Sequence, residues 1–213
     1  EKKRFREIDE VKRNIIRLYE DDFRKIDASG LSSRIYRDVP SQLSQNKKRY
    51  VISSATGKKT QKRDVERLYD VIDSQTVLIS YNITKPDISL SGTKDLDSYK
   101  LYIADTGLFV TLMFIDRSAA ENILYEKLLS DKLPANLGYL YENAAAQMIA
   151  ASGRELCYHT WQKEESTHYY EMDFLIGQKE KVVPIEIKSS ATTSHKSIDV
   201  FCNRYSKITS RPY

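Results

Sequence analysis

Glu171-Met172-Asp173-Phe174-Leu175-Ile176, followed after a short turn by Val182-Val183-Pro184-Ile185-Glu186-Ile187-Lys188, is the stretch that decides the fold. The two apolar runs predict a β-hairpin that carries Asp173, Glu186 and Lys188. Glu186 and Lys188 are two residues apart, so on a strand they point to the same face. Burying either charge alone is costly, and two explanations are open. One is a metal-dependent phosphodiester-cleaving site, and the other is a salt bridge at the end of a strand.

The composition fits a globular protein of one large or two small domains, with 213 residues, 30% of them charged and 40% hydrophobic. The net charge of +4 permits nucleic acid as a partner without arguing for it. Apolar runs fall far short of the ~20 residues that a membrane span needs, and no signal peptide is visible, so we expect no membrane contact. Cys157 and Cys202 lack zinc-site spacing, and two free thiols suit a cytoplasmic location. The chain begins at Glu1 inside a helical pattern, so we expect it to be a fragment of a longer protein.

The first hundred residues predict helices followed by two strands. A helix over residues 4–27 carries a stripe that faces a partner, and a second over 31–44 is kinked or broken near Pro40. A third spans about 61–74, with Thr60 as a candidate cap. Strands over 76–83 and 98–104 complete the order of a winged-helix-like domain over residues 1–98, which could bind DNA through its second helix and its wing. The stripe on the first helix consists of Phe5, Ile8, Val11, Ile15, Leu18, Asp22 and Ile26.

A basic tract between residues 46 and 63 contains no acidic residue. One interpretation is contact with DNA phosphates, to which each basic side chain adds a salt-dependent contribution. The other is ordinary surface charge on a loop and the start of a helix. The candidate nucleic-acid-binding residues are Lys47, Lys48, Arg49, Lys58, Lys59, Lys62 and Arg63.

The remaining sequence predicts a helix, an antiparallel meander of three strands and a last helix. Residues 105–135 are expected to be helical after a turn in which Asp105 is a cap or a site residue. A helix then runs from about residue 138 to Ala151, with Glu142 in its first turns and Met148 among its inward residues. The strands span 155–161, 167–176 and 181–189, and short turns join them. The last helix covers 197–205, and no strand is expected after it. The chain is therefore α+β or α/β, with a second domain over 99–213.

This order resembles the restriction-endonuclease-like fold and its PD-(D/E)xK motif. The matching positions are Glu142 on the helix, Asp173 on the second strand and Glu186-Ile187-Lys188 on the third. Four blocks also resemble the C-terminal region of a family of bacterial and archaeal AAA-type ATPases, in which a winged-helix-like linker and a nuclease-like domain of unassigned function follow the ATPase. They are residues 100–108, 138–143, 171–174 and 184–190. The chain has no P-loop motif, so ATP would bind only through an N-terminal ATPase domain of the same protein.

The resemblance implies a catalytic set of Glu142, Asp173, Glu186 and Lys188. Asp173, Glu186 and the Ile187 carbonyl would hold Mg²⁺ or Mn²⁺, which prefer hard oxygen ligands. Lys188 would orient or deprotonate a water or neutralise the phosphate, and Glu142 would complete the site. The alternative function is a non-catalytic adaptor that couples the ATPase to a protein partner or to nucleic acid. A ring-forming ATPase could also impose an oligomer.

Overall fold

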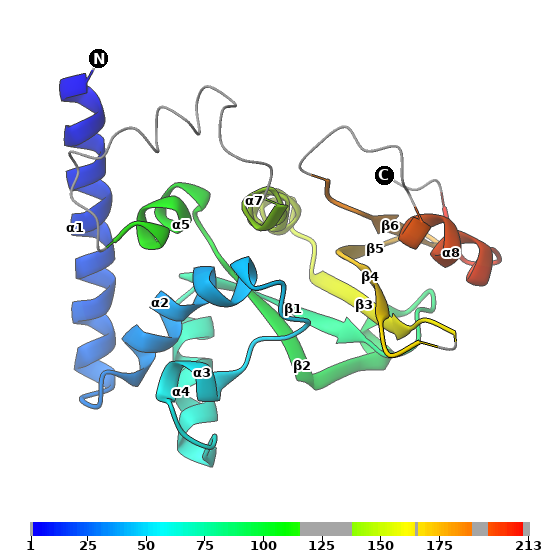
Figure 1. Cartoon of the computed structure of the whole chain (residues 1–213), viewed down its shortest axis with the longest axis horizontal. Helices are drawn as coiled ribbons and strands as arrows, with labels where there is room; N and C mark the ends of the chain where they lie inside the picture. The colour runs from blue at the N-terminus through cyan, green and yellow to red at the C-terminus, as the bar shows by residue number, and fades with distance from the viewer. Residues whose placement is uncertain (1, 116–137, 165, 189–195, 211–213) are drawn as a thin grey trace.

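The computed structural model describes residues 2–115, 138–164, 166–188 and 196–210. Helices dominate the first third of the chain, which forms one end of the molecule (Figure 1). The expected helical segment within 116–135 lies outside the described residues. No helix of the described part is long and apolar enough to cross a membrane. The first four helices are α1 (Lys2–Ile26), α2 (Leu31–Ser44), α3 (Ile52–Thr56) and α4 (Lys62–Asp73).

Helix α1 does not bury the stripe that its sequence pattern predicts. Ile8, Val11 and Leu18 are 50%, 57% and 62% exposed. The buried face instead carries Ile16 and Phe23, together with acidic groups that the pattern treats as polar surface. These acids are compensated by ion pairs, Asp9 with Arg13 and Glu20 with Arg37. Paired charges can be buried where single ones cannot, which is why hydrophobic periodicity selected the wrong face.

Helices α2 to α4 follow the predicted order with small corrections. Pro40 lies inside α2, yet the helix continues to Ser44, so the expected break is absent. The N-cap of α4 is Gln61 and not Thr60, and the Asp64 carboxylate accepts a hydrogen bond from the Gln61 N–H at 2.9 Å. This is the reciprocal half of a capping box. The sequence analysis did not predict α3, a short helix that ends at Gly57 with a φ of 68°.

A four-stranded mixed sheet joins the two halves of the chain. Its strands are β1 (Val77–Ile83), β2 (Lys94–Ile103), β3 (Leu156–Gln162) and β4 (Tyr169–Met172), in the order β2-β1-β3-β4. The β1–β2 and β3–β4 pairs are antiparallel, whereas β1 and β3 are parallel, with Tyr81 opposite Cys157. The 3₁₀ helix η1 (Leu90–Thr93) precedes β2. The two strands that were expected to form a wing are therefore part of a larger mixed sheet. The domain boundary expected between residues 98 and 99 falls within β2.

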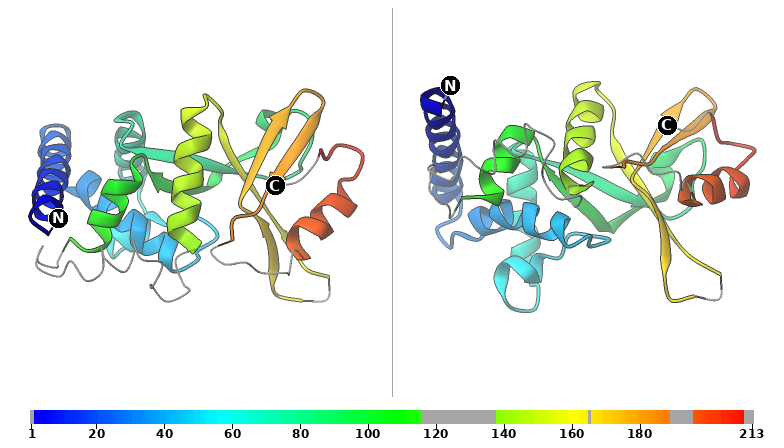
Figure 2. Two further views of the ribbon diagram at one scale, coloured as in Figure 1. Left: turned by 90° about the horizontal axis from the view of Figure 1, so that it is seen from above. Right: turned by 45° about the horizontal axis from the view of Figure 1, so that its top comes forward.

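Helices α5 (Thr106–Met113) and α7 (Gly138–Ala151) connect the sheet to the N-terminal helices. Asp105 caps α5 by accepting a hydrogen bond from the Leu108 N–H at 2.9 Å, as one of its two predicted roles requires. Helix α7 contacts β1, β2 and β3 and crosses these strands (Figure 2). The buried Asn143 side chain bonds both the N–H and the carbonyl of Ile103 and so fastens α7 to β2. Met148, predicted to point inward, is 73% exposed.

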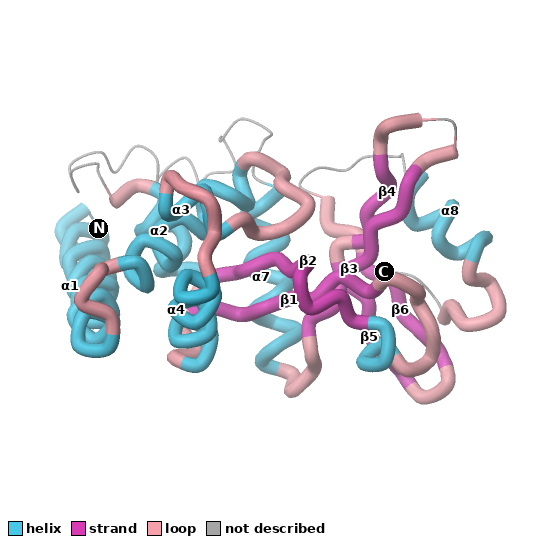
Figure 3. Tube along the Cα trace, turned by 90° about the horizontal axis from the view of Figure 1, so that it is seen from below, coloured by secondary structure: helices cyan, strands magenta, loops and turns pink. Residues whose placement is uncertain are grey.

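The predicted meander is present but is divided at Asp173. Strand β4 ends at Met172, and β5 (Phe174–Gln178) pairs with β6 (Lys181–Ile185) in a separate two-stranded antiparallel sheet. Helix α8 (Lys196–Arg204) packs beside β4 and β6, at the end of the molecule opposite α1 (Figure 3). After α8 the backbone of Thr209 forms a parallel bridge to Val182. A strand-like contact thus follows the last helix, where the sequence had shown none.

Candidate functional site

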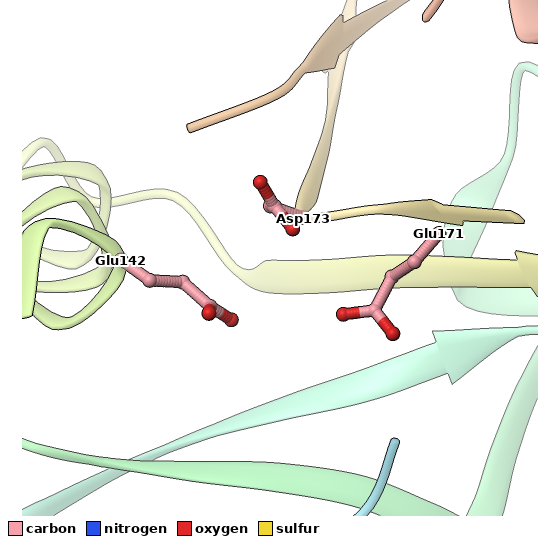
Figure 4. A group of neighbouring side chains, drawn as sticks. All are labelled: Glu142, Glu171 and Asp173. Carbon is pink, nitrogen blue, oxygen red and sulfur yellow. The ribbon is translucent and has the colours of Figure 1, made fainter. Parts of the chain in front are cut away.

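Three carboxylates converge where α7 meets the end of β4. Glu142 projects from the first turns of α7, Glu171 from β4, and Asp173 from the break between β4 and β5 (Figure 4). One oxygen of each side chain lies within 4.8 Å of one oxygen of the others. Like charges at this distance repel strongly, so the site needs compensating positive charge.

Part of that charge comes from Lys100 on β2. Its side chain is 6% exposed, and its Nζ lies 2.9 Å from Glu142 Oε1 and also forms an ion pair with Glu171. Burial alone lowers the pKa of Lys100, but the charges of Glu142, Glu171 and Asp173 outweigh it and raise the pKa above its usual value. The Lys100 ammonium is therefore positively charged at any physiological pH. Tyr102, two residues along β2, donates its hydroxyl to Glu142 Oε1 at 2.6 Å.

Asp173 is the most perturbed acid of the site. Burial, reinforced by the negative charge of Glu142, raises the pKa of Asp173 to about 7, although Lys100 and the Ile187 N–H act in the opposite direction. That N–H donates to Asp173 Oδ2 at 2.6 Å. A carboxyl group with this pKa exchanges its proton near neutral pH, which is a property that functional sites share more often than structural ones.

Glu186 and Lys188 lie outside the strand that was predicted to carry them, because β6 ends at Ile185. Lys188 Nζ lies 2.6 Å from Glu186 Oε1, which realises the salt bridge at a strand end that the sequence left open as an explanation. The Lys188 side chain is 39% exposed and that of Glu186 is 9% exposed. Glu186 Oε2 is buried and finds no hydrogen-bond partner within the described part of the chain. A buried acceptor without a partner costs roughly 1–3 kcal/mol, so this oxygen is available to bind a hydrogen-bond donor or a cation.

The structure divides the basic tract into two groups. Lys47 and Arg49 line a small hollow together with Lys100, and Lys48 Nζ lies 3.2 Å from the ring centroid of Tyr169 on β4. Lys47 and Arg49 therefore lie beside Lys100 on β2, and Lys48 lies beside β4, which carries Glu171. Four exposed residues form the second group, at the α3–α4 turn and the start of α4: Lys58, Lys59, Lys62 and Arg63.

Three groups of this site were not among the residues that the sequence pattern predicted. Lys100 and Tyr102 stand two residues apart on β2, and Glu171 stands two residues before Asp173. The pattern that could have identified them is the one that selected Glu186 and Lys188, namely polar side chains two residues apart with apolar neighbours. Only Glu142 and Asp173 of the predicted catalytic set belong to the group of oxygens within 4.8 Å.

Comparison with protein families gives one match, to a domain of unknown function named DUF4143, over residues 137–212. The match includes Glu142, Glu171 and Asp173 but not Lys100 or Tyr102. Comparisons with curated proteins and with solved structures gave no match.

Proposed function

We propose that the chain is a nuclease-like module that cleaves phosphodiester bonds in DNA with the help of Mg²⁺ or Mn²⁺. The observation that carries this proposal is the convergence of Glu142, Glu171 and Asp173 on one point from separate elements. Carboxylate oxygens are the ligands that these cations prefer. Within the longer protein that the sequence resemblance implies, the module would work beside an N-terminal AAA-type ATPase domain.

Charge balance favours a divalent cation at the cluster. With Asp173 ionised, the three carboxylates contribute three negative charges and Lys100 contributes one positive charge, which leaves two negative charges uncompensated. One divalent cation would neutralise them, and it would also offset the negative charge of Glu142, which adds to burial in raising the pKa of Asp173. A cation would therefore bind in competition with a proton on Asp173.

The arrangement of elements supports a restriction-endonuclease-like core. Helix α7, strands β3 to β6 and helix α8 follow the order expected of that fold, and Thr209 adds a parallel bridge beside β6. In that fold a helix, an aspartate strand and a Glu-x-Lys strand meet at the site. Here α7 and the β4–β5 break supply Glu142 and Asp173, and Ile187 from the Glu-x-Lys segment bonds Asp173. The preceding helices and the β1–β2 hairpin would form the winged-helix-like part.

Each residue of the site has a role that its contacts support. Glu142, Glu171 and Asp173 would hold the cation, with Glu186 Oε2 and the Ile187 carbonyl as further candidate ligands. The cation would supply an activated water and offset charge on the phosphate. Lys100 orients Glu142 and Glu171 by its ion pairs. Lys188, which is partly exposed, can turn from Glu186 toward a phosphate or a water.

The first basic group, Lys47, Lys48 and Arg49, would bind the DNA backbone next to this site. Lys47 and Arg49 share a hollow with Lys100, and Lys48 lies over Tyr169, two residues from Glu171 on the same strand. Positive side chains beside a metal site attract the phosphate backbone without reading its sequence. The second group, at the start of α4, would add contacts farther along the duplex.

One observation favours the alternative, a non-catalytic adaptor. Lys100 already pairs with two of the three acids, and a buried ion network of this kind can exist for structure alone. In that case the nuclease-like domain would bind a protein partner or nucleic acid and couple it to the ATPase. The distinction depends on whether a cation enters beside Lys100.

Metal titration followed by DNA cleavage separates the two functions. Mn²⁺ should bind the protein by calorimetry, and Glu142→Gln and Glu171→Gln should each weaken it at least tenfold, whereas the exposed Glu164→Gln serves as the matched control. The purified protein should then nick plasmid or single-stranded DNA with Mg²⁺ or Mn²⁺. Equal cutting by the Glu142 and Glu164 variants would refute catalysis at this site, because contamination would explain it. Binding of DNA or a protein partner without metal binding would establish the adaptor.

A further inference from the structure

Helix α1 carries two apolar faces, and among the residues that the structure describes the second is largely exposed. Ile16 and Phe23 face the interior, while Ile8, Val11 and Leu18 are at least half exposed on the neighbouring face. Exposing several large aliphatic side chains on one helix face marks an interaction surface more often than an ordinary exterior. We call this second face the α1 stripe, and it consists of Arg4, Ile8, Val11, Ile15, Leu18 and Asp22, of which Ile15 is partly buried against the core.

The spacing of the α1 stripe is that of a coiled-coil seam. Its members are separated by 4, 3, 4, 3 and 4 residues, which reproduces the alternation of a and d positions in a heptad. The four central members are apolar, and the two polar members, Arg4 and Asp22, stand at opposite ends. Four stripe residues, Arg4, Ile8, Val11 and Ile15, line one side of an open groove of about 620 Å³, whose other walls include Tyr19 and Leu108. The groove gives room for side chains of a second helix.

We infer that the occupant of this face is the α1 helix of a second copy of the chain, packed antiparallel across a two-fold axis. In the register centred on residue 13, Ile8 meets Leu18 of the second copy and Val11 meets its Ile15. The same register places Asp22 opposite Arg4 of the second copy, so the charged residues at the two ends of the stripe form pairs of opposite charge. By symmetry each contact occurs twice, as an isologous dimer requires. A parallel pair would instead place Asp22 against Asp22 and Arg4 against Arg4.

Local charges are compatible with this arrangement. Asp22 pairs within its own helix only with Lys25, and both side chains are strongly exposed, at 68% and 75%, so exchanging Lys25 for Arg4 of the second copy costs little. The register brings Glu7 near Asp21 of the second copy at the rim of the interface. Asp21 is already paired with Arg24 at 3.1 Å, and solvent and salt screen charges at such a rim.

Sedimentation equilibrium of the protein over roughly 1 to 100 µM tests the inference. We expect a monomer–dimer equilibrium. Asp22→Arg and Arg4→Asp should each weaken dimerisation about tenfold through like-charge contacts, and combining them should restore it. Glu10→Arg, a charge reversal on an exposed part of the same helix away from the stripe, is the matched control and should have no effect. A monomer at every concentration, or weakening by the control equal to that by Asp22→Arg, would overturn the proposal.

Disulfide trapping tests the direction of the helices. In a Cys202→Ser background, Ile8→Cys and Leu18→Cys proteins should form a mixed disulfide when combined, and each alone should form little. Residues 8 of the two copies would be about 15 Å apart along an antiparallel pair, from ten residues at ~1.5 Å each, which is too far for a disulfide. Rapid formation of an 8–8 disulfide would instead show a parallel pair and overturn the antiparallel arrangement.

Discussion

Replacing Asp173 with asparagine should stabilise the metal-free protein above pH 7 while it removes metal binding. The substitution keeps an oxygen that can accept the hydrogen bond from the Ile187 N–H. It removes the negative charge that burial and Glu142 make unfavourable. A residue retained at a cost to stability is expected of a functional group, so the sign of this effect bears directly on the proposed function.

The pKa of Asp173 gives the size and the pH range of the effect. Its folded-state pKa is raised from 3.8 to about 7, so between these values the folded protein binds more protons than the unfolded one. The contribution of Asp173 to stability therefore falls as the pH rises from about 4 to 7 and is level above that. A shift of about 3 pKa units at ~1.4 kcal/mol each corresponds to about 4 kcal/mol. Water entry and local repacking make this an upper bound.

Urea unfolding at several pH values between 4 and 8, in the presence of a chelator, measures the effect. The difference in free energy of unfolding between Asp173→Asn and the unsubstituted protein should grow with pH in favour of the variant. Asp87→Asn, on an exposed loop, is the control. Added Mn²⁺ should stabilise the unsubstituted protein and leave the variant unchanged. A variant that is less stable at pH 8 than the unsubstituted protein would refute the argument, because Asp173 would then be a net stabilising partner of Lys100.

Two further predictions concern the acidic site, and a third concerns the buried His159 on β3. Lys100→Met leaves Glu142 and Glu171 without their cation and should cost roughly 3–5 kcal/mol in urea unfolding with chelator, of which saturating Mn²⁺ should recover part. Lys188→Ala should change the free energy of unfolding by less than about 1 kcal/mol, as for other partly exposed pairs, yet it should lower DNA cleavage at least tenfold; cleavage equal to that of the unsubstituted protein would exclude Lys188 from the chemistry. Burial lowers the pKa of His159 to about 4, so the folded protein binds fewer protons than the unfolded one between pH 4 and 6.5. The contribution of His159 to stability should be lost as the pH falls through that range, by up to ~3 kcal/mol, and His159→Gln should remove this part of the pH dependence.

Local patterns in the sequence predicted most elements because local forces decide them. The helix containing Glu142, the cap at Asp105 and the last helix all follow from periodicity and capping chemistry, and the structure confirms them. The antiparallel β3–β4 and β5–β6 pairs were also predictable, since their short turns permit no other connection. The parallel pairing of β1 with β3 was not, because more than 70 residues separate the paired positions and no local signal connects them.

The candidate site was only partly predictable for the same reason. Glu142 and Asp173 were found through a motif whose spacing is carried within one half of the chain. Lys100 comes from β2, and only the three-dimensional fold brings it to Glu142. The incorrect prediction of the buried face of α1 has a different origin. Two buried acids, Asp9 and Glu20, look like surface residues until their arginine partners are known.

The contribution of β2 bears on what constitutes the functional unit. The DUF4143 match begins at residue 137, but within the described residues Glu142 has ion-pair and hydrogen-bond partners on β2, at Lys100 and Tyr102. Asn143 is bonded to Ile103, and β3 pairs with β1. A fragment of residues 137–212 would therefore expose the edge of β3, leave Asn143 without its bonds and leave the three carboxylates without Lys100. The acidic cluster belongs to the sheet that both halves of the chain build together, so the first half of the chain is part of the site and more than a linker.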